Sequence, residues 1–198
     1  MAKFEPKHFA KTLDSFAKEV LPPEVYKKWG ANGLRKMDQS ILEFIDAFRY
    51  DTNVPLTINT PWNGQFTQSG MRTADHYGTL HRGLASVNMD KFKLLDEVET
   101  YRKMESSLSD HITGRAADVK SSKLTGHELR KEFIANEQEY YEQYGINFIE
   151  VGPIKRGSEW VDMSWAHFGK RLDIGQGVEY WSPKHGFVTK EFVLENRL

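Results

Sequence analysis

Apolar residues recur at helical spacing in several stretches of the chain. Residues 8–20 carry such a pattern, and Pro22 and Pro23 end the helix that it predicts. Residues 24–29 follow as a short helical turn, and residues 34–49 form a second amphipathic helix. Two further helices are predicted over residues 90–104 and over residues 124–144, the latter from a Thr125 cap to Gly145.

Short runs of β-branched and apolar residues between these helices predict strands. They are PLTINT (55–60), AADVK (116–120), INFIEV (146–151) and EWVDMSW (159–165), with a further hairpin within residues 178–193. The order of helices and strands predicts an α+β fold in which a small, mostly antiparallel sheet packs with helices.

Length, charge and cysteine content narrow the possible chemistry. The chain has 198 residues, which suits one domain, and its net charge of −1 does not favour binding to nucleic acid or to anionic lipid. It has no cysteine, so a metal site would have to use His, Asp or Glu. We expect no secretory signal and no membrane span, because no uncharged apolar run is long enough.

The segment SLSDHITGRAADV, residues 107–119, carries the candidate chemistry. His111 and Asp118 are seven residues apart, a spacing that suits a turn feeding a strand rather than one helix face. Gly114 can adopt the turn conformation, and the adjacent alanines allow a close approach of backbone. The spacing alone leaves two readings open: His111 and Asp118 are ligands of one metal ion, or a histidine on a loop lies beside a capping aspartate.

The order and spacing of Ser109, His111, Gly114, Ala116 and Asp118 resemble the signature of the D-alanyl-D-alanine carboxypeptidase-like zinc peptidases. This family includes phage endolysins that cut L-alanyl-D-glutamate bonds and the D-Ala-D-Ala dipeptidases. The resemblance implies a Zn²⁺ cofactor with His111 and Asp118 among its ligands, and a peptidoglycan peptide as substrate.

The resemblance covers roughly residues 34–172. It implies a peptidase-like domain over residues 34–198, of the hedgehog/DD-peptidase type with the metal site at the sheet, preceded by an N-terminal helical extension over residues 1–33. The segment ending in Arg72 is similar to the family's S-G-x-R turn, which implies that Arg72 stabilises the oxyanion. Ser109 would orient the site or the substrate.

Two alignments compete for the third metal ligand within SEWVDMSWAHF, residues 158–168. In the first, His167 is the ligand and Asp162 or Glu159 is the general base. In the second, Asp162 lies where the family has a histidine. Asp162 and His167 would lie on opposite faces of an uninterrupted strand, so the first alignment requires a bend near Trp165. We favour His167 as ligand and Asp162 as base, because a second histidine improves a zinc site. Glu150 is a reserve acid.

The resemblance therefore predicts a zinc metallopeptidase that degrades the bacterial cell wall, as a phage or prophage endolysin. Such an enzyme would lie in the host cytoplasm before release or on the virion. The alternative is a non-catalytic phage structural or cell-wall-binding module that retains the fold.

Overall fold

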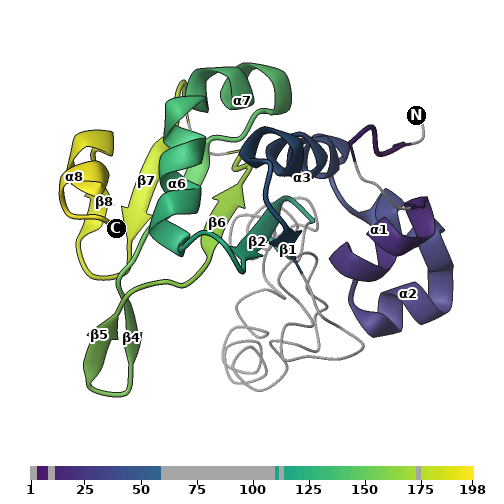
Figure 1. Ribbon diagram of the computed structural model, residues 1–198, viewed down its shortest axis with the longest axis horizontal. Helices are drawn as coiled ribbons and strands as arrows, with labels where there is room; N and C mark the ends of the chain where they lie inside the picture. The colour runs from purple at the N-terminus through teal and green to yellow at the C-terminus, as the bar shows by residue number, and fades with distance from the viewer. Residues whose placement is uncertain (1–3, 9–11, 59–109, 112–113, 173–174) are drawn as a thin grey trace, which may run out of the picture.

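A six-stranded mixed sheet and the helices that cover it make up the computed structural model, which describes residues 4–8, 12–58, 110–111, 114–172 and 175–198 (Figure 1). Neighbouring strands are antiparallel except β3 and β7, which run parallel. The predicted α+β class is confirmed. Across the sheet the strands are β1 (Leu56–Thr57), β2 (Ala116–Ser121), β6 (Ala166–Gly169), β3 (Phe148–Glu150), β7 (Glu179–Ser182) and β8 (Gly186–Val188).

Side-chain caps mark the start of α1, α3, α6 and α8. The Asp38 side chain accepts a hydrogen bond from the Ser40 amide at 2.9 Å, so the helix predicted from residue 34 begins at Gln39. The helix predicted over residues 124–144 is two helices that meet at Asn136. The helices are α1 (Leu13–Val20), α2 (Pro23–Trp29), the 3-10 helix η1 (Gly30–Lys36), α3 (Gln39–Thr52), α6 (Gly126–Ala135), α7 (Glu137–Tyr144) and α8 (Lys190–Glu195).

One face of the sheet forms the core with α3, α6 and α7 (Figure 1). Phe168 of β6 lies opposite Ala117 of β2 and Ile149 of β3, and all three are completely buried. The Phe168 ring lies 5.2 Å from the ring of Phe44 in α3 and 5.1 Å from that of Phe133 in α6. This row of residues therefore points toward the helices.

Neighbouring rows of a sheet point to opposite faces, so the next row points away from these helices. Asp118 of β2 lies opposite His167 of β6, which lies opposite Glu150 of β3. Three polar side chains from separate strands are therefore placed side by side on the face opposite the aromatic core.

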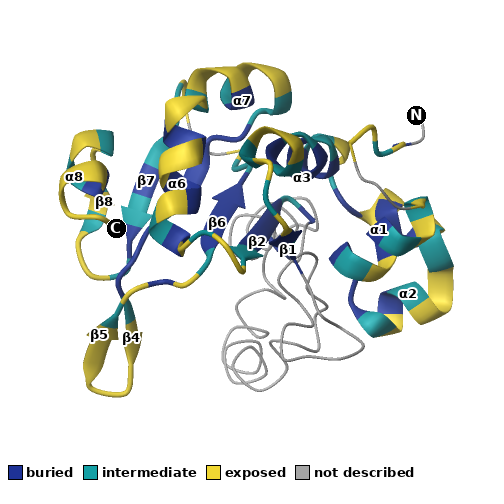
Figure 2. Ribbon diagram, viewed as in Figure 1, coloured by how far each residue is buried: buried dark blue, intermediate teal, exposed yellow. Residues whose placement is uncertain are grey.

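The chain between Glu159 and Gly169 does not form one strand. Strands β4 (Ile154–Arg156) and β5 (Glu159–Val161) form a separate hairpin that projects from the sheet and is largely exposed (Figure 2). Residues 162–165 then lead into β6. The bend required by the first alignment is present, and it separates the side-chain alternation of β5 from that of β6.

The N-terminal helices are tied to the rest of the molecule. Buried residues of α1 belong to the same apolar cluster as those of α3 and β6. The Arg49 side chain of α3 pairs with Glu19 of α1 at 2.6 Å. The division into residues 1–33 and 34–198 stays a prediction, and the helix predicted over residues 90–104 lies outside the described residues. Within the described part of the chain, none of the helices has the length and apolar character needed to cross a bilayer.

Gly114 joins the candidate site to the helical layer, and we expect Gly114→Ala to destabilise the protein. Its φ is +71°, and an added Cβ would lie 2.7 Å from the Lys36 carbonyl oxygen and from the Met37 Cα. Left-handed backbone alone costs a non-glycine residue about 1–2 kcal/mol, and the contact with backbone adds to it. Thermal unfolding should show a loss of at least about 2 kcal/mol. Gly157→Ala, which also has positive φ but open space around it, is the matched control for the contact.

Candidate metal centre

His111 lies in a turn that leads into β2. The Gly114 amide donates to the His111 carbonyl at 3.2 Å, and the Arg115 amide donates to the Asp110 carbonyl at 2.7 Å. The Gly114 carbonyl accepts from the Asp38 amide at 3.0 Å, which fastens the turn to the start of α3. These bonds hold His111 beside the sheet, where it is 2% exposed.

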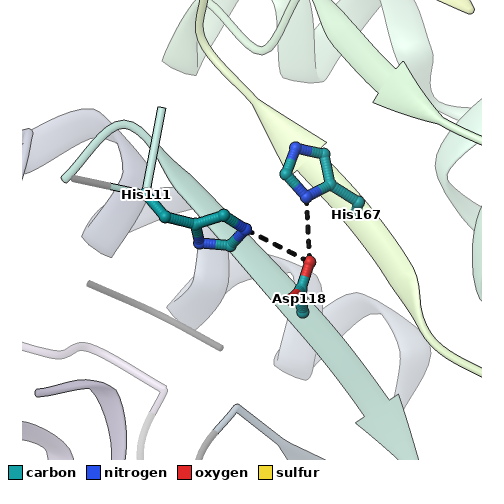
Figure 3. Close-up of side chains that lie close together, drawn as sticks. All are labelled: His111, Asp118 and His167. Atoms are coloured by element: carbon teal, nitrogen blue, oxygen red, sulfur yellow. Dashed lines mark hydrogen bonds and ion pairs between the residues drawn. The ribbon is translucent and has the colours of Figure 1, made fainter. Parts of the chain in front are cut away.

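The side chains of His111, Asp118 and His167 converge on one point (Figure 3). His167 Nδ1 lies 2.8 Å from Asp118 Oδ1, and His111 Nε2 lies 3.4 Å from the same oxygen. The two imidazole centroids are 4.9 Å apart, with an angle of 71° between the rings. Both rings therefore direct a nitrogen at one carboxylate oxygen.

This geometry and burial suit a metal ion. One ligand atom from each residue lies within 4.8 Å of the others, and all three residues are buried. Imidazole nitrogen and carboxylate oxygen are donors that divalent transition metals bind. The group can therefore hold a metal ion, with the ligands coming from a turn and from two adjacent strands.

The electrostatics of Asp118 point the same way. Burial by itself raises the pKa of this carboxyl, but the positive charges of His111 and His167 and hydrogen bonds from both rings hold the pKa well below its usual range. Asp118 is therefore ionised, and its buried charge requires a cationic neighbour. A divalent metal ion would take over the charge balance that protonated rings otherwise supply.

A cavity of about 280 Å³ opens beside the three ligands. Glu150, Phe148 and Trp165 line it together with Asp110 and the three candidate ligands. Phe148 meets the His167 ring edge to face, with centroids 6.1 Å apart. Glu150 shares the cavity with the three candidate ligands because β3 pairs with β6 in a register that sets it opposite His167.

The acids predicted to serve as general base lie elsewhere. Glu159 is on the exposed β5 hairpin, and Asp162 lines a different cavity with Arg130. Neither acid lines the cavity beside the three candidate ligands, so their placement gives no support to either as base.

Two other predicted site residues lie in a part of the chain that the structure does not describe. Arg72, predicted to bind the oxyanion, and Ser109, predicted to orient the substrate, lie outside the described residues.

Comparisons of the chain with family models, with curated proteins and with solved structures found no match. The resemblance carried by residues 109–118 therefore stays a prediction.

Proposed function

We propose that this protein is a zinc-dependent peptidase whose metal ion is held by His111, Asp118 and His167. The observation that carries the proposal is the convergence of these three buried side chains beside a cavity. His111 and Asp118 belong to the motif that resembles the family signature, and the fold brings His167 to them from 49 residues beyond Asp118.

The distances among the donors are compatible with zinc. Metal–ligand bonds of about 2.0 Å in a tetrahedral arrangement place ligand atoms about 3.3 Å apart. The two measured nitrogen–oxygen distances, 2.8 and 3.4 Å, lie close to this value. Three protein ligands with space beside them are typical of a catalytic zinc site, in which a fourth position is left for water or substrate.

The bound metal would supply Lewis acidity and would make water nucleophilic near neutral pH. The chain itself would supply a general base and the apolar side chains that line the cavity. Glu150 is the carboxylate that lines the cavity beside His167, so it would accept the proton of the attacking water and return it to the leaving amine. Phe148 and Trp165 would limit the access of bulk water and position the peptide.

The substrate class rests on the resemblance. We propose cell-wall peptides of the D-Ala-D-Ala or L-Ala-D-Glu type, because the residues from Ser109 to Asp118 follow the signature of peptidases that cut these bonds. In this proposal Arg72 stabilises the oxyanion and Ser109 contacts the substrate, and a phage or prophage lysin is the biological setting.

The test is metal analysis together with a cleavage assay. The full chain, purified and dialysed, should contain close to one zinc per molecule by elemental analysis. It should release peptide fragments from purified peptidoglycan, detected by mass spectrometry. Chelation should stop the release and added zinc should restore it. A protein that binds no zinc at micromolar concentration would contradict the proposal.

The placement of Asp162 and Glu159 favours a second candidate, a non-catalytic module that binds cell wall or serves as a phage structural part. Neither acid near the third ligand lies at the metal group, which is the expected outcome if catalysis has been lost. Sedimentation with intact peptidoglycan, without release of fragments by zinc-loaded protein, would favour this candidate over the peptidase.

A further inference from the structure

Arg130 is a buried cation that is not part of the candidate metal centre. It lies on α6 and is 1% exposed. Its Nη1 donates to the Trp165 carbonyl at 2.8 Å, and its Nε has no hydrogen-bond partner in the described part of the chain. Burial lowers the pKa of Arg130 to about 10, partly offset by the charge of Asp162, so the guanidinium stays charged at neutral pH. A buried charge with one neutral acceptor is costly unless an anion completes its environment.

Arg130 is one of the residues that line a cavity of about 870 Å³. Positive charge predominates among its charged lining residues, since Lys123 and Arg197 join Arg130, whereas Asp162 is the acid. The hydroxyl residues Ser121, Ser122, Thr125 and Ser164 complete much of the polar lining. This composition is complementary to a small anion that accepts hydrogen bonds.

The start of α6 adds to the positive potential of the cavity. Gly126 and His127, at the first turn of this ten-residue helix, line the cavity, and the N-terminal end of a helix dipole is positive. Thr125 and Glu128 already form a capping box there. The helix therefore contributes positive electrostatic potential, and Arg130 contributes the hydrogen-bond donors that a ligand would contact.

We propose that this cavity is a binding site for a small carboxylate, with the guanidinium of Arg130 as its anchor. A guanidinium offers parallel N–H donors that match the two oxygens of a carboxylate. A phosphate also accepts such bonds, but inorganic phosphate is a mixture of monoanion and dianion near neutral pH and so carries more than one negative charge on average. Asp162 at the cavity would repel the second charge, so the site favours a monoanion. The inference does not depend on whether the metal centre is catalytic.

The proposal gives Asp162 a role distinct from that of a metal ligand or a base. Its carboxylate is exposed, lines the cavity and interacts electrostatically with Arg130. Asp162 would therefore weaken anion binding and select against higher charge. Removing its charge should strengthen binding, which is the opposite of what removal of a ligand-contacting residue would do.

The experiment is a titration of the ¹⁵N-labelled full chain with acetate and, separately, with inorganic phosphate. The Arg130 Nε–H resonance is followed by NMR and assigned by its loss in Arg130→Lys. We expect a saturable shift of this resonance with acetate and weaker binding of phosphate. Asp162→Asn should tighten acetate binding about threefold, the effect of removing one unit charge roughly 6 Å away in water, and should tighten phosphate binding more.

Glu132→Gln is the matched control, because it makes the same change at an exposed acid of α6 that does not line the cavity. Its acetate affinity should equal that of the unmodified chain. Three outcomes would overturn the proposal: no saturable shift of the Arg130 resonance, tighter binding of phosphate than of acetate, or equal affinities in Asp162→Asn and Glu132→Gln. If Arg130→Lys does not fold, assignment through backbone-linked spectra leaves the comparison of the two acid variants intact.

Discussion

Replacing Asp118 with alanine should abolish zinc binding while the fold is retained. One oxygen of Asp118 lies within 3.4 Å of both histidine nitrogens, so its loss removes a ligand and the charge that holds the two rings together. Loss of a group that only supports a ligand costs about 10- to 100-fold in metal affinity, so loss of the ligand itself should exceed 100-fold. Competition with a chromogenic chelator measures the affinity, and circular dichroism checks the fold.

The fold should survive because the aromatic core lies on the opposite face of the sheet. His111→Ala and His167→Ala should lose zinc in the same way, whereas Asp162→Asn should keep it. This set separates the two alignments of residues 158–168. Full zinc in His167→Ala together with loss of zinc in Asp162→Asn would show that the third ligand is Asp162 and that the group seen here is not the metal site.

The second large effect is expected at Glu150. Glu150→Gln should keep zinc and should lower kcat for peptide cleavage by about 100- to 10,000-fold, the range that a general base contributes. The amide has nearly the same shape as the carboxylate, but it cannot accept the proton of the attacking water. Zinc content and kcat are measured on the same preparation, with a defined cell-wall peptide as substrate.

Asp162→Asn is the informative comparison for this prediction. This variant makes the same chemical change at the acid that the sequence favoured as base. Because Asp162 lines a different cavity, the variant should cleave the peptide at the normal rate. Normal kcat in Glu150→Gln combined with loss of cleavage in Asp162→Asn would return the base role to Asp162.

Local patterns explain which parts of the site were predictable. The His111 turn, the strand that carries Asp118 and the Thr125 cap depend on neighbours in the chain, so spacing and residue type were sufficient to predict them. The place of Glu150 depends on the pairing of β3 with β6, a contact between distant segments that periodicity does not encode.

The place of Asp162 relative to the candidate site was hard to predict for a related reason. Its position relative to His167 depends on where β5 ends and β6 begins, and these two strands belong to different sheets. Arg130 was missed although a signal was present. It lies three and four residues before Phe133 and Ile134, on the apolar face of a predicted helix, where a charged residue is unexpected.

The origins of the three ligands have a consequence for how a metal ion would be exchanged. Asp118 and His167 are fixed by paired strands that also carry core residues, so they would keep their positions when the ion leaves. His111 is held by a turn, which requires fewer bonds to open. We expect the departing ion to lose His111 first, so the dissociation rate would be set by the opening of this turn. Asp118 and His167 would then stay in position to bind the next ion, which would speed metal rebinding.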